Sequence, residues 1–235
     1  MQNFPDTLAH SIGLIFSGDP QLWAVVLLSL KVSLIAVVAS GLIGLPLGAL
    51  LAVGRFRGRQ AIIVFLNALM GLPPVVVGLV VYLMLSNNGP LGVFQLLYTP
   101  TAMIIAQTIL VTPIVAALTR QLLESLNAEY SEQLRSFGVT GFASIPTLLW
   151  DGRFGLSTAL LAGFGRAIAE VGAVIIVGGN INHVTRTMTT SIALETSRGN
   201  LELALALGTI LVLTAILVNA AVTIVGMPAR RVENG

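Results

Sequence analysis

Two side chains of opposite charge, Arg166 and Glu170, interrupt the otherwise apolar stretch LSTALLAGFGRAIAEVGAVIIVGGN. Their spacing of four residues predicts that they share one face of a helix. At a rise of 1.5 Å per residue, Arg166 would lie about 20 Å along that helix from Arg153 at its polar end. In a bilayer this is near the middle of a hydrocarbon core about 30 Å thick. A charge is costly there unless it meets a partner or a watery cavity.

The pair has two interpretations. A structural one makes it a mutually neutralised ion pair that ties its helix to neighbouring helices. A functional one places it on a translocation pathway or at its gate, where the cation would favour an anionic substrate. We favour the pathway, because intramembrane ionisable residues are usually functional. The flanking Gly163, Gly165 and Gly172 would let neighbouring helices approach closely.

Two adjacent prolines, Pro73 and Pro74, lie within another apolar stretch. They remove two backbone donors from a helix interior and predict a kink. Irregular backbone at membrane depth often lines a cavity, and a packed structural kink is an equal alternative. Both prolines are therefore candidates for the pathway or gate, together with Arg166 and Glu170.

The composition requires a membrane around these residues. Of the 235 residues, 55% are hydrophobic and 9% are charged, and the mean hydropathy is +0.93. Soluble domains carry about 25% charged residues, so a water-exposed surface cannot be made from this set. The apolar stretches also lack the alternation of barrel strands. We therefore expect an all-α membrane protein.

Five apolar runs are long enough to cross a bilayer as helices. They cover residues 22–53, 60–85, 101–122, 156–178 and 203–225. The first run exceeds one crossing and contains Lys31, whose side chain could reach the nearer surface. Residues 4–16 predict a short interfacial helix, in a segment without the basic residues of a cleavable signal peptide. We expect residues 1–235 to form a single transmembrane domain.

The basic residues predict an orientation. Eight of them would lie on one side of a five-span protein: Arg55, Arg57, Arg59, Arg120, Arg135, Arg153, Arg230 and Arg231. The opposite side receives only Arg186 and Arg198, which is a clear positive-inside asymmetry. The uncharged loop 86–99, with its Asn, Gly and Pro turn residues, belongs on that opposite side. The N-terminus is therefore expected outside and the C-terminus inside.

The polar connection 123–155 is longer than a link between two membrane helices requires. Apolar residues recur in and beside it at helical spacing, at Leu122, Leu126, Tyr130 and Leu134. Gly138 and Gly141 interrupt the pattern, so the segment predicts two short helices on the cytoplasmic surface. Such a helix could dock in a groove of a partner protein or rest on lipid headgroups. We favour docking.

The sequence SEQLRSFGVTGFASIPTLLWD within this connection resembles the cytoplasmic loop of permeases from ATP-binding-cassette (ABC) importers. That loop reads Glu-Ala-Ala, three residues, Gly, nine residues, then Ile-x-Leu-Pro. Glu132 and Gly138 stand at the matching separation, and Leu148 takes the place of the Ile. The departures are Gln133 and Leu134 for the two alanines, and Trp150 and Asp151 for the Leu and Pro.

In that family the loop forms a coupling helix that docks on an ATPase subunit. The resemblance therefore implies ATPase-coupling roles for Glu132, Arg135, Phe137, Gly138 and Phe142. Phe137, Val139 and Phe142 would be apolar anchors, with Glu132 and Arg135 as charged flanks.

A second resemblance covers nearly the whole chain from Leu28 onward. The segment RAIAEVGAVIIVGGN looks like the fourth core helix of molybdate, tungstate and sulfate permeases. SLKVSLIAVVASGLIGLPLGALLA and LPPVVVGLVVYLMLSNNGPLG resemble the same group, a branch of the type I ABC importers. TRTMTTSIALETSRGNLELALALG, from Thr185, resembles tungstate permeases in particular.

These resemblances imply the permease subunit of an ATP-driven importer of a tetrahedral oxyanion, most closely tungstate, working by alternating access. They imply cytoplasmic ATP-binding subunits, an extracytoplasmic oxyanion-binding protein, and a bacterial or archaeal cytoplasmic membrane. Five spans enclose too little for a gated pathway, so we expect a homodimer. Molybdate or sulfate import stays open, as does a stand-alone secondary transporter with Glu170 as its proton carrier.

Catalysis by this chain is not expected. It has no G-x-x-x-x-G-K-[ST] phosphate loop, and its only lysine, Lys31, falls in a predicted span. With no cysteine, and with His10 and His183 outside the longest apolar runs, we expect no metal site, no cofactor and no Ser-His-Asp triad. A membrane anchor of a redox complex is disfavoured for the same reason. No basic surface suggests nucleic acid.

Overall fold

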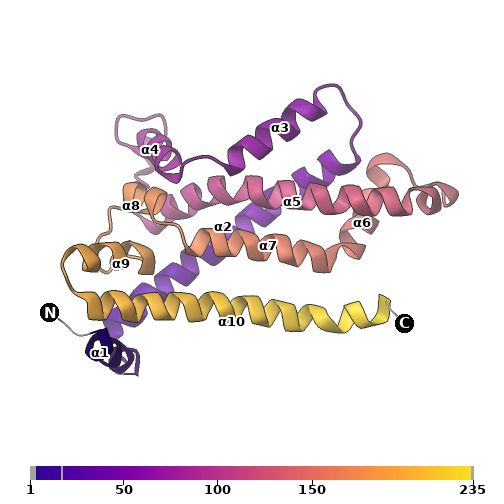
Figure 1. Ribbon diagram of the computed structural model, residues 1–235. Helices are drawn as coiled ribbons and strands as arrows, with labels where there is room; N and C mark the ends of the chain where they lie inside the picture. The colour runs from indigo at the N-terminus through magenta and orange to yellow at the C-terminus, as the bar shows by residue number, and fades with distance from the viewer. Residues whose placement is uncertain (1–3, 17, 234–235) are drawn as a thin grey trace. The chain divides into compact units, whose positions relative to one another are not determined.

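The computed structural model describes residues 4–16 and 18–233, so the ends of the single domain expected over residues 1–235 fall outside the described part. No strand occurs among the described residues, which agrees with the expected all-α class. The helices are shown in Figure 1. In chain order they are α1 (Phe4–Phe16), α2 (Pro20–Val53), α3 (Arg59–Met70), α4 (Pro74–Leu85), η1 (Gly92–Phe94), α5 (Pro100–Ser136), η2 (Gly141–Ser144), α6 (Ile145–Asp151), α7 (Arg153–Ile168), α8 (Gly172–Gly178), α9 (Met188–Ser197) and α10 (Leu201–Glu233).

Three helices, α2, α5 and α10, are long and apolar enough to cross a membrane without a break. They correspond to the expected spans 22–53, 101–122 and 203–225, although α5 continues to Ser136. Each of the other two expected spans is divided, 60–85 into α3 and α4 and 156–178 into α7 and α8. Within the described residues there are therefore three spans, or up to five if each divided pair counts as one.

The chain bends by 99° where the sequence predicted a kink at Pro73 and Pro74, and the bend is a break between two helices, α3 and α4. Pro73 is the N-cap of α4 and Pro74 is its first residue. Proline is tolerated at this position because the first amides of a helix have no intrahelical partner. The two prolines therefore begin a helix, and the preceding helix α3 ends at Met70.

The chain forms two compact units, each built from separated segments. The first unit contains the described residues of Met1–Ile35, Pro73–Gln107 and Ala167–Asn219. The second contains those of Ala36–Leu72, Thr108–Arg166 and Ala220–Gly235. The long helices α2, α5 and α10 each contribute to both.

In the first unit, α4 packs closely against α8 (Figure 1). A Cβ atom placed on Gly78 would lie 2.7 Å from the Cα atom of Ala173, so a larger residue does not fit. Gly78 lies on the buried side of α4 between Val77 and Val81. Small residues of this kind allow the close helix contacts that are common in membranes.

In the second unit, glycines bring α2 and α7 close to α5. A Cβ atom on Gly48 would lie 2.6 Å from the carbonyl oxygen of Ala116, and one on Gly163 would lie 2.9 Å from the Val111 side chain. Nearer the ends of these helices, α2, α5 and α6 share a buried apolar cluster. Its members are Ala49, Ala52, Leu123 and Leu148.

Candidate functional site

The first candidate site is the break between α7 and α8, in the first unit. α7 ends at Ile168 and α8 begins at Gly172, so Glu170 lies between the two helices. Its side chain is buried, with 4% of its surface exposed. Its Oε1 accepts a hydrogen bond from the Ala173 amide at 3.0 Å. The carboxyl group therefore caps the N-terminal end of α8, where the helix dipole also favours negative charge.

Side chains from two other helices donate hydrogen bonds to backbone carbonyls at this break. Gln107 on α5 donates from Nε2 to the Ala167 carbonyl at 3.0 Å, and the Glu170 amide donates to the same carbonyl at 3.2 Å. Thr189 on α9 donates from Oγ1 to the Glu170 carbonyl at 2.8 Å. Buried backbone groups away from water need such partners. The break is thus an ordered, hydrogen-bonded junction.

Gln107 and Thr189 were not among the predicted site residues. A single glutamine within the apolar run IIAQTILV of α5 is a signal that sequence reasoning could have used. Thr189 gives a weaker signal, because it belongs to a group of hydroxyl residues at the start of α9. Thr187 and Thr190 form the capping box of that helix, and the Met188 amide donates to the Ser29 hydroxyl of α2 at 2.7 Å.

The first turn of α4 lies beside the same break. A Cβ atom on Gly172 would lie 2.9 Å from Val75 Cγ2 and 3.6 Å from Glu170 Oε1. Val75 directly follows Pro74, the first residue of α4. The N-terminal ends of two interrupted helices therefore meet next to one buried carboxyl group. In transporters such ends face anionic substrate groups.

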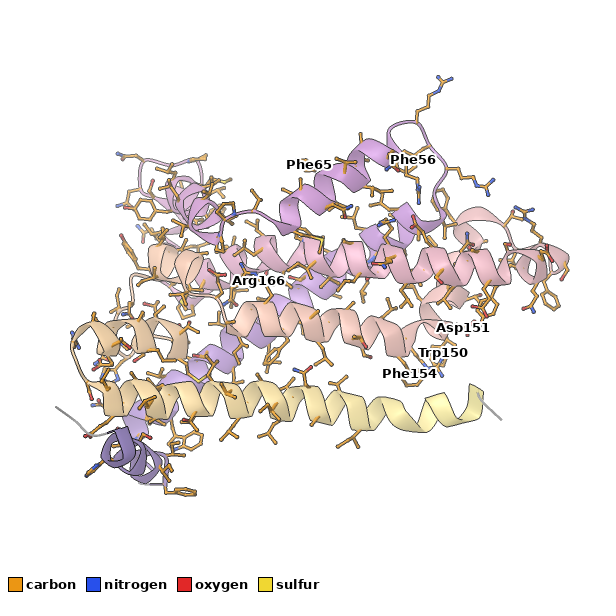
Figure 2. The ribbon with its side chains drawn as sticks, viewed as in Figure 1. Phe56, Phe65, Trp150, Asp151, Phe154 and Arg166 are labelled. Carbon is orange, nitrogen blue, oxygen red and sulfur yellow. The ribbon has the colours of Figure 1, made fainter. Side chains whose placement is uncertain are left out.

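The expectation that Arg166 and Glu170 share one face of a helix was wrong, and their pairing stays a prediction. Arg166 lies in the last turn of α7 (Figure 2) and is partly buried. Glu170 lies beyond the end of that helix, so the spacing of four residues does not place both on one helical face. Arg166 belongs to the second unit and Glu170 to the first. A pathway or gate role for either residue remains a prediction.

The second candidate site, which we term the coupling segment, comprises residues 132–154 in the second unit. The expectation of two separate short helices in this region was wrong in part, because α5 continues unbroken to Ser136. The apolar residues Leu126, Tyr130 and Leu134 pack against the cluster around Leu123, which extends the buried face of α5. Only η2 and α6 form a separate short helical region.

Gly138 ends α5 with a positive φ of 75°. Its amide donates to the Arg135 carbonyl at 3.0 Å, and the Val139 amide donates to the Leu134 carbonyl at 2.8 Å. This pattern is a Schellman cap, in which glycine adopts the left-handed conformation without steric penalty. The backbone at this position therefore favours glycine. Glu132 and Arg135 are exposed on the last turns of α5.

Exposed aromatic side chains are concentrated in the coupling segment. Phe137, Phe142 and Trp150 are 81%, 60% and 69% exposed. Leu148 of α6 is fully buried in the cluster with Ala49 of α2. The short helix α6 is therefore attached by Leu148 and leaves Trp150 exposed. Sequence reasoning did not identify Trp150 as an anchor, because it occupied a position where the family pattern has a different residue.

Figure 2 shows Trp150, Asp151 and Phe154 together where α6 ends and α7 begins. The guanidinium carbon of Arg153 lies 4.8 Å from the ring centroid of Trp150 and 4.6 Å from that of Phe154. Both distances are suitable for cation–π attraction. Across the described residues, no group of three or more His, Cys, Asp or Glu side chains is placed to hold a metal ion.

Replacing Glu170 tests its role as a cap. Glu170→Leu leaves the Ala173 amide without its acceptor, and a buried unsatisfied donor costs about 1–3 kcal/mol. Its folded yield and melting temperature should fall, measured by gel filtration of heated, fluorescently tagged protein. Glu170→Gln keeps an oxygen in place and should retain both, as should Glu129→Leu at an exposed position of α5. Equal stability of Glu170→Leu and Glu170→Gln would contradict the cap.

The fold and both sites can be compared with known proteins. Residues 44–227 match the family model described as binding-protein-dependent transport system inner membrane component. Over 197 residues, covering 82% of this chain and 85% of the relative, the chain is 43% identical to a "Probable anion ABC transporter permease protein" of Haloferax volcanii. Over 222 residues, covering 94% and 97%, it is 39% identical to the "Tungstate uptake system permease protein TupB" of Peptoclostridium acidaminophilum.

A similar fold occurs in a chain of the MetNI methionine ABC transporter in an inward-facing conformation. The TM-score is 0.73 at 17% sequence identity, covering 89% of this chain and 98% of that one. These matches locate the protein in the inner membrane of a bacterium or archaeon. The chain belongs to the family of inner membrane components of binding-protein-dependent transport systems, the permease subunits of ABC importers.

Proposed function

We propose that this permease imports a tetrahedral oxyanion, with tungstate as its principal substrate. Relatives named as anion and tungstate permeases support this substrate class. The observation that carries the proposal is the meeting of two interrupted helices, α4 and α8, beside Glu170. Helix N-termini at such breaks favour anions, and a break with satisfied backbone groups can persist at membrane depth.

Arg166, Glu170, Pro73 and Pro74 belong to the pathway or its gate in this proposal. Pro73 and Pro74 set the start of α4, and Glu170 holds the start of α8. Arg166 supplies positive potential that attracts the anion. Glu170 caps α8, and a carboxylate on the pathway would limit how tightly an anion is held. Weak holding suits transport, since the substrate must also leave.

The coupling segment docks on a cytoplasmic ATP-binding subunit in this proposal. Phe137, Phe142 and Trp150 provide exposed apolar anchors, and Glu132 and Arg135 flank them. An apolar anchor with charged flanks suits a helix that binds in a groove. Leu148 joins α6 to both α2 and α5. Movement of the ATPase would thus reach two membrane helices and drive alternating access.

The working unit in this proposal is a homodimer with two ATP-binding subunits and an extracytoplasmic oxyanion-binding protein. A chain with up to five spans encloses too little for a gated pathway, and two-fold symmetry is the commonest solution. An exposed apolar surface on α10 is available to a second copy or to lipid. It includes Val212, Leu213, Ile216 and Leu217.

The proposed orientation has the N-terminus outside and the C-terminus inside, and cysteine labelling can test it because the chain has no cysteine. Asn88 and Ala143 are both exposed, in the expected outer loop and the coupling segment respectively. Asn88→Cys should react with a membrane-impermeant thiol reagent in intact cells. Ala143→Cys should react only after the cells are permeabilised. Labelling of Ala143→Cys in intact cells would show that the orientation is the opposite of the one proposed.

Gly138 variants test the coupling segment. Gly138→Val forces a side chain into the left-handed region, at a cost of about 1–2 kcal/mol, and should release the ATP-binding subunit during purification of the complex. Gly138→Asn should release less, because asparagine tolerates this conformation.

The matched control for these variants is Gly58→Val. Gly58 also has a positive φ, 89°, and open space around it, but it lies outside the coupling segment. Gly58→Val should keep the ATP-binding subunit bound. Full retention by Gly138→Val, or equal loss by Gly58→Val, would show that the segment has no special part in docking.

Uptake by the purified complex in proteoliposomes tests the function directly. ATP is supplied on the side of the membrane that carries the ATP-binding subunits, and the binding protein and the anion are supplied on the opposite side. Tungstate should then accumulate on the ATP side, and more efficiently than molybdate or sulfate. The anion is measured by mass spectrometry of the washed vesicles. Equal or better uptake of molybdate or sulfate would correct the substrate, and no uptake of any oxyanion would refute the proposal.

The same assay separates a pathway role of Arg166 from a structural one. Arg166→Gln combined with Glu170→Gln removes both charges while leaving an acceptor for the Ala173 amide, so the protein should fold. If Arg166 attracts the anion, this double variant should lose most of its uptake. Full uptake by a correctly folded double variant would leave the two charges a structural role only.

A further inference from the structure

The second unit contains a basic pocket of about 740 Å³ beside the coupling segment, which contributes only Arg135 to its lining. It lies between the end of α2, the turn that follows it, the start of α3 and the C-terminal part of α5. Four arginines line it: Arg55, Arg57, Arg59 and Arg135. A pocket of this size lies within the range of about 300–1,000 Å³ that is usual for small-molecule sites.

The pocket carries an excess of positive charge. Glu124 is the single acidic residue among its described lining residues. Its carboxylate is shared, because Arg59 binds Oε1 and Arg120 binds Oε2. The Nε of Arg59 also donates to the Leu51 carbonyl at 2.7 Å. Glu124 therefore holds two guanidinium groups in place and neutralises only one of them.

Two further arginines of the lining are open to an external anion. Within the described residues, Arg55 and Arg57 make no ion pair, and both are exposed. Asn127 and Ser131 of α5 contribute neutral polar groups to the same wall. Guanidinium groups bind phosphate oxygens through paired N–H donors. The lining therefore suits a phosphate group.

The pocket lies where apolar helices give way to polar chain. α2 has no charged residue after Lys31 and ends at Val53, and the arginines follow at once. Phe56, which also lines the pocket, is 46% exposed. From Arg59 onward α3 is largely apolar again, with Ile62, Val64 and Phe65 exposed. A basic pocket bordered by exposed apolar side chains matches a lipid, with a charged headgroup and apolar chains.

We propose that this pocket binds the phosphate headgroup of an anionic phospholipid, which fixes the turn between α2 and α3 next to the coupling segment. Arg55 and Arg57 hold the headgroup, and Arg59, positioned by Glu124, forms the floor. The apolar chains lie along Phe56 and the exposed face of α3. This site is independent of the transported substrate.

The full chain can be tested in its complex and alone. It is purified in mild detergent from vesicles of phosphatidylcholine with added phosphatidylglycerol, and the retained lipid is counted by native mass spectrometry. Wild-type protein should retain phosphatidylglycerol, with or without the ATP-binding subunit. Arg55→Gln combined with Arg57→Gln should retain roughly tenfold less, since each basic residue adds to the attraction of anionic lipid.

Two controls accompany this variant. Arg198→Gln removes one charge at an exposed position in the other unit and should retain lipid as the wild type does. Arg55→Lys combined with Arg57→Lys keeps the charge without the paired donors. Its retention of phosphatidylglycerol should lie between that of the wild type and that of the double glutamine variant. Both substituted residues are exposed, so folding is not expected to change.

Two results would overturn the proposal. The first is unchanged phosphatidylglycerol retention by the Arg55→Gln and Arg57→Gln variant; if that variant also loses the ATP-binding subunit, the pocket is part of the docking surface. The second is binding of inorganic phosphate, dependent on the same arginines, by protein that retains no lipid; this would make the pocket a site for free anions.

Discussion

A buried backbone amide or carbonyl must have a hydrogen-bond partner, and within a membrane that partner must come from the protein. This constraint decides where helices of this permease can be interrupted. Between α7 and α8 the partners are side chains: Gln107 donates to the Ala167 carbonyl of α7, Glu170 caps α8, and Thr189 donates to the Glu170 carbonyl. At the start of α4 no such partner is needed for the first residue, because Pro74 has no amide hydrogen. The two interruptions thus use different chemistry, and Gly172 allows them to lie side by side.

Much of the fold follows from the sequence, because apolar length and the scarcity of charge predict membrane helices whatever their packing. The ends of α2 and α10 agree with the predicted spans within a few residues, apart from the polar extension of α10. The interruptions were harder to predict. RAIAEVGAV reads as a helix by local preference, and only the acceptor supplied by Glu170 and the donors supplied by Gln107 and Thr189 make a break stable there. Gln107 and Thr189 lie 60 and 19 residues away from the groups that they bind, so the segment RAIAEVGAV does not reveal them by itself.

The coupling segment shows how a partial family pattern can be compatible with the family's fold. Gly138 is required by its left-handed backbone, and Leu148 is required as the buried attachment of α6. Trp150 and Asp151, where the sequence departs from the pattern, are exposed, so their side chains do not have to fit into the core.

Family membership also removes the support for a stand-alone secondary transporter. The exposed surface of the coupling segment could not be predicted from the sequence. The exposure of Trp150 and the position of Arg153 over the Trp150 ring depend on how α6 is attached.

The central claim is that the interruption at Glu170 is an ordered junction rather than a loose loop. Hydrogen–deuterium exchange of the permease in lipid nanodiscs, read at the Ala173 amide, tests this claim most directly. Amides in the first turn of a helix ordinarily have no intrahelical partner, so without the cap this amide would exchange rapidly once water reached it. The account predicts slow exchange in the wild type and clearly faster exchange in Glu170→Leu. Rapid exchange in the wild type, or the same rate in both proteins, would contradict it.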